Sequence, residues 1–471
     1  MRKILPIAVI LFLYASVTHA QKFYTGCLIE DSVYERMPQN APLLTRDYTV
    51  LPERHSLEKY CPTPNNQGPY GTCVGWSTAY AARTIAEAVA NKWSHREKID
   101  QEAFSPLFVY LNIKGINDNN CQNGTAISNA LNFLKNEGIA KYKDFNFKCA
   151  SSVPLEIQNN IRQYKIDDYS ALFGLMATPE EIIRKTKKAL SEDKPVITTI
   201  NCYDSFTTAK EVWTGITDKS MGAHAVCLTG YDDNKNGGSF QIMNSWGIDW
   251  GVDGFTWITY NDFSKHVRYA YEMFVRKKTV PYQHKPVINI LKTVNLAGNI
   301  RFELSVGKEM QGTLYYPSNG LPYYKLSGDY ISGTRYRIYI SNNEPAYVYV
   351  IGSDLTNNVN KLFPPNRHIS PALLYKSNDI AIPDEKLFME MDNITGTDYI
   401  CVLYSYEALP VDEIIEKIKN ASGSFSDKVK TALADKMIPA KEIKYKQKTI
   451  RFSVKNTEKT VVPVIIEIKH I

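Results

Sequence analysis

The chain has 471 residues, and at roughly 150 residues per domain this length predicts about three domains. Hydrophobic residues make up 44% and charged residues 22%, as in ordinary globular proteins, which excludes a disordered chain, a collagen-like repeat and a coiled coil. The net charge of +6 arises from 55 Lys and Arg against 49 Asp and Glu, and over this length it is too dilute to indicate a nucleic-acid partner.

The first twenty residues have the three parts of a secretory signal peptide. Basic residues at positions 2 and 3 precede an apolar run over 4–17, and a small residue, Ala20, ends the segment. The run is shorter than the roughly 20 apolar residues of a membrane-spanning helix, and no later stretch is as long. We expect cleavage near Ala20, a secreted protein (extracellular or periplasmic) and no membrane span. A retained N-terminal anchor is the less favoured alternative.

The region 51–278, after a short arm or propeptide over 21–50, mixes helical and strand signals. Apolar residues at helical spacing predict a long helix over Val74–Trp93 and a second helix over Thr125–Asn136. A third helix is expected to begin at Thr178, because Thr-Pro-Glu-Glu supplies an N-cap, a proline at the first helical position and early carboxylates. The β-branched run Val196–Ile200 predicts a strand, and alternating runs and turns continue over 224–260.

The last part of the chain changes character after a proline-bearing stretch over 279–288, which is expected to be a linker. Short alternating runs over 336–341, 346–352 and 399–404 are separated by turn clusters. This spacing predicts a β-sandwich or barrel over 289–471, with one amphipathic helix over 411–418. The predicted fold class is α+β.

One cysteine stands where a nucleophile would be activated. Cys73 directly precedes the long predicted helix, and the positive end of the helix dipole favours a thiolate there. Gln67, six residues earlier on a glycine-bearing loop, can direct its side-chain amide to the same point. Together with the Cys73 main-chain N–H, this amide predicts a two-donor oxyanion hole.

A base and its orienting group follow in the order that the chemistry needs. His224 begins an apolar strand, and Asn244 lies in the segment Asn-Ser-Trp-Gly. An Asn carbonyl that accepts from one imidazole nitrogen leaves the other nitrogen to face the thiol. Trp246, beside them, is expected to shield this hydrogen bond from water.

These segments resemble the papain family of cysteine peptidases, with Gln67, Cys73, His224 and Asn244 at the four catalytic positions. His224 is 151 residues and Asn244 171 residues after Cys73, slightly beyond the roughly 130–150 that is usual, and long loops absorb the excess. The resemblance covers about 230 residues, from about 51 to 276. It implies a helical lobe that carries Cys73, a β-barrel-like lobe that carries His224 and Asn244, and an extended peptide substrate in the cleft between them.

The resemblance also implies substrate contacts. The loop over 121–124 looks like the family's loop that bonds the substrate main chain, which makes Asn123 and Gly124 candidate substrate-binding residues together with Ala223 and Trp246. We expect a thioester acyl-enzyme that water hydrolyses. No cofactor and no metal are expected, since the remaining histidines are isolated and lack metal-ligand spacing.

The chain departs from the family at three positions. Val74 replaces the tryptophan that usually follows the nucleophile, and two usual cysteines are replaced by Tyr70 and by a residue near Asn112. Their usual partners remain as Cys121 and Cys149, and we expect these two to pair with each other. The long helical propeptide of most relatives is also missing, and whether the arm over 21–50 inhibits stays open.

Two rival functions and the role of the last domain stay open from sequence alone. A catalytically degenerate papain-fold binding protein is disfavoured because all four catalytic positions are filled, and a thiol acyltransferase typically uses Asp where Asn244 stands. The region 289–471 resembles a β-rich domain of unknown function that is appended to bacterial peptidases, which indicates a bacterial origin. It is expected to bind a surface, a glycan or a protein partner, or to serve as a structural lid.

Overall fold

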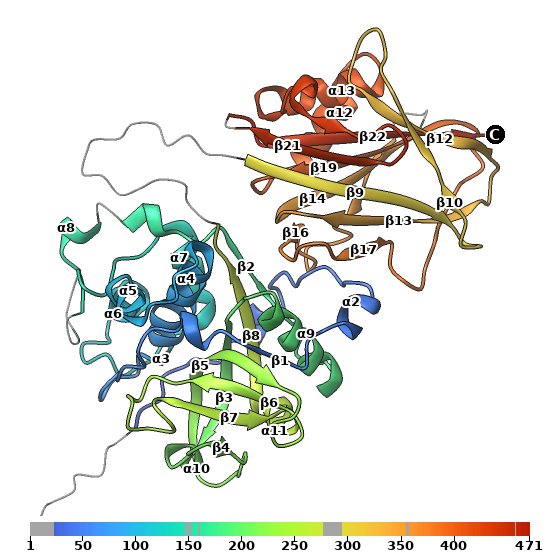
Figure 1. Cartoon of the computed structure of the whole chain (residues 1–471). Coiled ribbons are helices and arrows are strands. Elements are labelled where there is room, and N and C mark those ends of the chain that lie inside the picture. Colours follow the sequence, from blue (N-terminus) through green and yellow to red (C-terminus); the bar gives the residue numbers. More distant parts are fainter. Residues whose placement is uncertain are drawn as a thin grey trace, which may run out of the picture.

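A computed structural model shows two halves that meet along one side (Figure 1). It describes residues 23–146, 149, 153–158, 161–276, 294–354, 358–456 and 458–471. The predicted signal peptide and the whole predicted linker therefore lie outside the described residues. Within them, no helix has the length and apolar character to cross a membrane. The predicted domain boundaries stay predictions.

The N-terminal arm lies extended against the first half, with two short helices, α1 (Asp31–Tyr34) and α2 (Arg46–Thr49). Strand β1 (Arg54–Ser56) follows and pairs antiparallel with β5 (Ser220–Asp232). The arm also bonds the sheet of this half before β1, because the Cys27 N–H donates to Ala223 in β5 and the Ala171 N–H, at the end of β2 (Asp168–Ala171), donates to Pro38.

The helical lobe is built around one continuous helix over residues 73–91, close to the predicted span. Its first turn is α3 (Cys73–Gly75), its middle is a π-helix (Trp76–Arg83), and its end is α4 (Thr84–Asn91). A side chain at Gly75 would meet the Pro106 carbonyl oxygen at 2.3 Å, so a glycine is needed where α3 packs against the helix that begins at Pro106. The other helices of the lobe are α5 (Arg96–Gln101), α6 (Pro106–Ile113), α7 (Ile127–Asn136) and α8 (Leu155–Gln158).

The second lobe is a mostly antiparallel sheet in the order β2-β8-β3-β5-β6-β7-β4. Helix α9 (Pro179–Ser191) begins as predicted, because the Thr178 side chain accepts a hydrogen bond of 3.3 Å from the Glu181 N–H. The remaining elements are β2 (Asp168–Ala171), β3 (Val196–Tyr203), α10 (Asp204–Thr207), β4 (Val212–Trp213), β6 (Ser239–Met243), β7 (Phe255–Thr259), α11 (Tyr260–His266) and β8 (Val267–Phe274).

The second half is a sandwich of two sheets, in agreement with the predicted architecture. One sheet has the order β17-β13-β9-β21-β20 with β10 and β18 at its sides, and the other has β11-β12-β22-β19-β14-β15 with β16. Both sheets contribute to one apolar core. The first sheet contains β9 (Val294–Leu304), β10 (Glu309–Met310), β13 (Arg335–Asn342), β17 (Asp379–Ile382), β18 (Met389–Glu390), β20 (Lys444–Tyr445) and β21 (Arg451–Asn456). The second contains β11 (Gly312–Tyr315), β12 (Tyr323–Tyr330), β14 (Ala346–Ser353), β15 (Val359–Phe363), β16 (Ala372–Leu373), β19 (Gly396–Ser405) and β22 (Val461–His470).

Two helices, not the single predicted one, pack outside this sandwich. The amphipathic pattern over 411–418 forms α12 (Val411–Asn420), as expected. The second helix, α13 (Phe425–Leu433), begins with a capping box in which Ser424 and Asp427 bond each other's main chain. The Ser-x-x-Asp pattern of this box is a sequence signal that could have predicted α13.

Candidate active site

Cys73 lies at the first position of α3 and is fully buried. Burial raises the pKa of its thiol to about 12, and nearby main-chain N–H groups, that of Ala225 first, act in the opposite direction. Ala225 directly follows His224 in β5, so the start of the long helix meets the central strand of the other lobe at this point. The predicted nucleophile and the predicted base thus lie on facing elements.

His224 is held by Asn244 through a hydrogen bond of 2.8 Å between Nε2 and Oδ1. The same Oδ1 accepts from the Ser245 main-chain N–H at 2.8 Å, which identifies this atom as the oxygen of the side-chain amide. Since an oxygen can only accept, Nε2 of His224 carries the proton of the neutral ring. Nδ1 is buried and has no hydrogen-bond partner within the described part of the chain.

Aromatic rings shield this pair from water. The Trp246 ring is stacked on the His224 ring with 4.8 Å between centroids, and Phe206 contacts both rings. Burial lowers the pKa of His224 to about 4, and the hydrogen bond to Asn244 acts in the opposite direction. In the state described, both Cys73 and His224 therefore favour their neutral forms.

Gln67 projects its side-chain amide into the site from the loop before α3. Its Nε2 donates to the main-chain oxygens of Tyr70 at 2.7 Å and of Tyr24 at 3.1 Å. Its Oε1 accepts from the Ser245 hydroxyl at 2.7 Å, and its main-chain N–H donates to the Ser245 oxygen at 2.8 Å. Ser245 was not predicted as a site residue, although its place next to Asn244 was a usable signal.

The partner of Gln67, Tyr24, belongs to a segment of the arm that lies within the site. We call residues 23–28 the plug. The Trp246 Nε1 also donates to the Tyr24 oxygen, at 3.1 Å, and the Phe23 ring is stacked on the Trp246 ring with 4.6 Å between centroids. The main-chain N–H of Gly26 is among the groups that lower the pKa of the Cys73 thiol. The plug thus reaches the atoms of the predicted nucleophile and oxyanion hole.

The plug is bonded on both sides through its main chain. The Cys27 N–H donates to the Ala223 oxygen at 3.2 Å, the Leu28 N–H donates to the Thr125 oxygen at 2.9 Å, and the Thr125 N–H donates to the Gly26 oxygen at 3.0 Å. An extended chain therefore bridges the two lobes, with Ala223 on one side and Thr125, next to Gly124, on the other. Residues 23–28 themselves occupy the position that the sequence predicts for a substrate.

Three glycines make this close passage possible. A side chain at Gly26 would meet the Gly71 oxygen at 2.2 Å, and one at Gly124 would meet the Gly26 oxygen at 2.4 Å. Gly124 has a φ of +76°, a conformation that glycine adopts at little cost. Gly71 is itself packed against the Gln122 main chain. The plug fits because none of the three positions carries a side chain.

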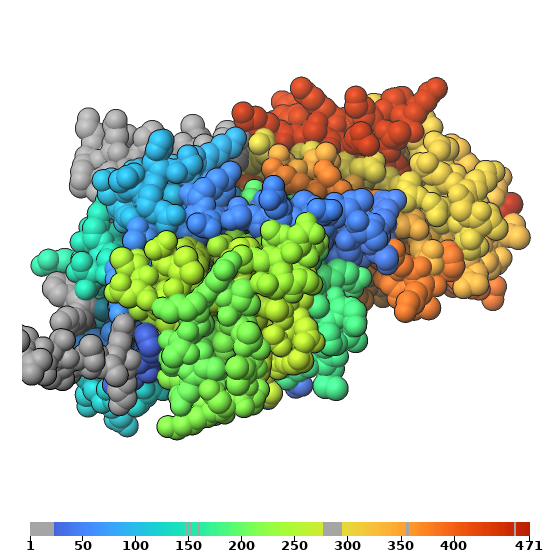
Figure 2. Space-filling view, turned by 60° about the horizontal axis from the view of Figure 1, so that its bottom comes forward, coloured from blue at the N-terminus to red at the C-terminus, as the bar shows by residue number. Residues whose placement is uncertain are grey.

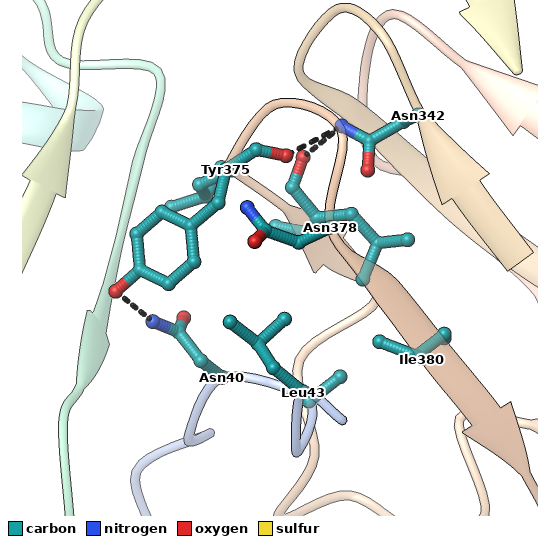
Figure 3. A pocket seen from close by; sticks show the side chains of 10 residues that line it. Asn40, Leu43, Asn342, Tyr375, Asn378 and Ile380 are labelled. Atoms are coloured by element: carbon teal, nitrogen blue, oxygen red, sulfur yellow. Dashed lines mark hydrogen bonds between the residues drawn. The ribbon is translucent and has the colours of Figure 1, made fainter. Parts of the chain in front are cut away.

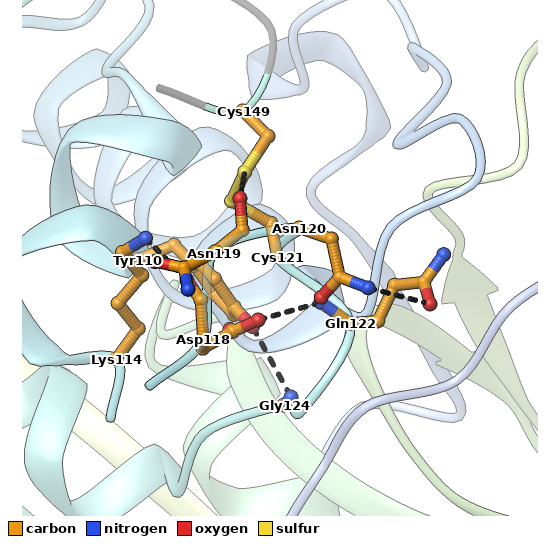
Figure 4. The surroundings of a disulfide bond; sticks show 9 residues. All are labelled: Tyr110, Lys114, Asp118, Asn119, Asn120, Cys121, Gln122, Gly124 and Cys149. Atoms are coloured by element: carbon orange, nitrogen blue, oxygen red, sulfur yellow. Dashed lines mark hydrogen bonds between the residues drawn. A yellow bond between two sulfur atoms is a disulfide. The ribbon is translucent and has the colours of Figure 1, made fainter. Parts of the chain in front are cut away.

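The loop that carries Gly124 is fixed by hydrogen bonds to Tyr110 and Asp118 (Figure 4). Tyr110 accepts from the Gly124 N–H at 3.1 Å and donates to Asp118, whose other oxygen accepts from the Gln122 N–H at 3.1 Å. The Asn123 side chain is exposed. The pairing of Cys121 with Cys149 that the resemblance implied is confirmed, and this disulfide ties the loop to a segment 28 residues later.

Comparisons with known proteins give the family of each half. Residues 55–275 match the model of the papain family cysteine protease, and residues 329–408 match the Domain of unknown function (DUF4384). A peptidase C1-like protein of Acanthamoeba polyphaga mimivirus is 26% identical over 205 residues, which are 40% of this chain and 62% of that protein. Cysteine proteinase 3 of Entamoeba histolytica is 23% identical over 254 residues, 51% of this chain and 72% of that protein.

Solved structures with a similar fold include xylellain, a cysteine protease from Xylella fastidiosa, at 22% identity and a TM-score of 0.43, with 54% of this chain and 97% of that chain covered. The match to the mimivirus protein spans less than two thirds of that protein, and the match to a gamete and mating-type specific protein of Dictyostelium discoideum spans 29% of it.

The matches to the two family models identify the domains. The chain carries a papain-family cysteine protease domain, followed by a domain of the DUF4384 family.

Proposed function

We propose that the chain is a secreted cysteine peptidase that hydrolyses peptide bonds with Cys73, His224, Asn244 and Gln67. The observation that carries the proposal is the hydrogen bond of 2.8 Å from His224 Nε2 to Asn244, which leaves Nδ1 as the free basic atom. The arrangement on facing elements, with Cys73 at a helix start, supports the same roles.

The proposed reaction is an acyl transfer through the Cys73 sulfur. The thiol gives its proton to His224 Nδ1, and the thiolate attacks the carbonyl carbon of the peptide. Gln67 Nε2 and the Cys73 N–H donate to the oxyanion that forms. The imidazolium then protonates the leaving amine, and His224 activates the water that hydrolyses the thioester.

The proposal includes an inhibited resting state, because a substrate cannot enter while the plug is bonded to Gln67, Ala223 and Thr125. Burial by the plug and both lobes also keeps Cys73 and His224 neutral. Activation therefore requires that residues 23–28 leave the cleft.

An irreversible peptidyl epoxide tests the proposed activity. We expect slow labelling of the full chain and labelling about tenfold faster or more in Gly26→Ala, because the added side chain would clash with Gly71 and expel the plug. Cys73→Ala in the same background should abolish the label, whereas Cys401→Ala, a buried cysteine of the C-terminal domain, should retain it. No labelling of a chain whose plug is displaced would favour the binding-protein alternative.

Secretion is the other part of the proposal, and it rests on the basic, apolar and small-residue segments of positions 2–20. N-terminal sequencing of the exported protein is expected to begin near residue 21. Recovery of the full-length chain in the membrane fraction would instead favour the retained anchor.

A further inference from the structure

The arm contacts the C-terminal domain as well as the active site. We call residues 38–47 the strap, because this segment runs between the two halves of the molecule (Figures 1 and 2). Its first part is bonded on both sides by main-chain atoms: the Ala171 N–H donates to Pro38, the Gln39 N–H donates to His368, and the Ser370 N–H donates to Gln39, at 3.1, 2.8 and 2.7 Å. The strap is thus an added strand-like layer between the peptidase domain and the C-terminal domain.

The second part of the strap is bonded mainly to the C-terminal domain. The Leu44 N–H donates to the Asp379 oxygen at 3.1 Å, and Arg46 forms an ion pair with the Asp379 side chain. Thr45 donates through its N–H and its hydroxyl to Glu385, at 3.0 and 2.8 Å. These contacts are made to β17 and the residues that follow it, and none of them involves the peptidase domain.

Between these parts, Asn40 of the strap bonds both the peptidase domain and the C-terminal domain at a junction around Glu272; Figure 3 shows its bond to Tyr375 of the C-terminal domain. Its Nδ2 donates to Glu272 of the peptidase domain and, at 3.1 Å, to the hydroxyl of Tyr375 in the C-terminal domain. Tyr375 donates to the second Glu272 oxygen at 2.9 Å, and Ser170 donates to the Asn40 oxygen at 2.7 Å. Glu272 is fully buried, so the loss of one donor would leave a buried carboxylate short of a partner.

The strap and the plug are connected by only nine residues, 29–37, and these are fixed as well. Tyr34 is buried and donates to the Phe173 oxygen at 2.7 Å, and Asp31 forms an ion pair with Arg268. A segment that is anchored at one end and ordered in between holds its other end at a high effective concentration near its binding site. The contacts of the strap therefore add to those of residues 29–37 in favouring a bound plug.

We propose that the C-terminal domain holds the strap and thereby keeps the plug in the catalytic cleft. The coupling between the strap and the plug does not depend on the peptidase activity proposed above. Its biological consequence, an inhibited peptidase, rests on that proposed activity. It assigns to the second domain an occupant that is a segment of the same chain. A cut within 29–37 would then free the plug, while the strap stays as a permanent part of the interface.

Hydrogen exchange tests the coupling without any need for activity. In full-length Cys73→Ala, the N–H groups of Cys27 and Leu28 report on the plug, because both are hydrogen-bonded only when it is seated. We expect Asp379→Ala with Glu385→Ala to speed the exchange of both the strap and the plug by about tenfold or more. Glu385→Ala alone, at an exposed site, is expected to have a smaller effect in the same direction.

Asp412→Ala is the matched control. Asp412 is an exposed carboxylate of the same domain that pairs with Lys361, away from the strap, and its loss is expected to leave the exchange of residues 23–28 unchanged. If the strap variants loosen 38–47 while the exchange of the plug stays as in the parent, the inference is overturned. An equal effect of Asp412→Ala would overturn it too, since the response would then be non-specific.

The same variants with Cys73 restored separate this inference from the proposed activity. If both hold, Asp379→Ala with Glu385→Ala raises the rate of labelling by the peptidyl epoxide about tenfold over the full chain, and Asp412→Ala does not. If exchange of the plug increases but neither these variants nor Gly26→Ala are labelled, the proposed activity fails and the coupling stands. If Gly26→Ala is labelled rapidly and the strap variants behave as the parent, the activity stands and the coupling fails.

Discussion

Ser245 orients the Gln67 amide, which we propose as an oxyanion donor, through a hydrogen bond of 2.7 Å to Gln67 Oε1. Without this hydroxyl the Gln67 amide keeps only its bond to the Tyr70 oxygen within the loop and is held less firmly, and a donor that is less well fixed before the reaction stabilises the transition state less. We expect Ser245→Ala, in the Gly26→Ala background, to lower kcat for a peptide substrate by roughly tenfold with little change in KM. Steady-state kinetics measure both constants.

Ser239→Ala is the control for this variant, because Ser239 is also buried in the sheet but its hydroxyl donates to the Lys235 oxygen at 2.8 Å, outside the site. It should leave kcat unchanged. A rise in KM alone for Ser245→Ala would mean that the hydroxyl serves substrate binding, and it would contradict the orienting role.

At the scale of elements, the plug adds to the burial that keeps His224 and Cys73 neutral. Burial lowers the pKa of His224 to about 4, whereas an imidazole in water has a pKa of about 6.5. Protonated His224 therefore favours the open state, and the equilibrium should shift toward opening as the pH falls from about 6.5 to about 4, by up to roughly tenfold per unit. Burial raises the pKa of the Cys73 thiol to about 12, so with the plug in place this thiol stays protonated over the whole range.

A pH-jump experiment measures this shift. The full chain is held at pH values from about 7.5 to about 4, returned briefly to neutral pH and treated with the epoxide, so that the label reports how much plug has left. We expect more label after acid incubation of the full chain and no dependence on the incubation pH in Gly26→Ala. Equal labelling of the full chain at all incubation pH values would show that His224 does not control opening.

Elements with periodic side-chain patterns were predictable, and elements made by main-chain contacts were not. The helix over 73–91, the start of α9 at Thr178 and the sandwich strands follow from apolar spacing and a cap. The π-helical middle of the long helix was not predicted, because apolar residues at helical spacing do not distinguish a π-helical turn from an α-helical one. The plug was missed because the atoms that fix it, such as the Tyr24 oxygen and the Cys27 N–H, exist in every residue.

The predicted site residues came from a motif, and motifs record only side chains. Gln67, His224 and Asn244 each use a side-chain atom in the site, so their types were informative. Thr125 contributes only its main chain, and no residue type at that position would have indicated its role. The junction at Asn40 was equally hidden, since its partners lie 232 and 335 residues away in the chain.

At the scale of the whole molecule, the junction around Tyr375 should couple the stabilities of the two domains. All six tryptophans, at positions 76, 93, 213, 246, 250 and 257, belong to the peptidase domain, whereas Tyr375 belongs to the C-terminal domain. Tyr375→Phe removes the donor to Glu272 and the acceptor for Asn40, and a buried carboxylate that loses a hydrogen bond costs about 1–3 kcal/mol. Tryptophan fluorescence during urea unfolding thus reports on one domain after a change in the other.

We expect Tyr375→Phe, in a Cys73→Ala chain that cannot digest itself, to lower the urea midpoint seen by tryptophan fluorescence. Tyr316→Phe, at a tyrosine that is 65% exposed in the same domain, should change the unfolding free energy by less than about 0.5 kcal/mol. If the urea midpoint seen by tryptophan fluorescence is the same in Tyr375→Phe as in the parent, the two domains unfold independently. Coupling of the kind expected would instead mean that the strap and both domains form one cooperative unit, because the buried Glu272 accepts hydrogen bonds from Asn40 of the strap and Tyr375 of the C-terminal domain.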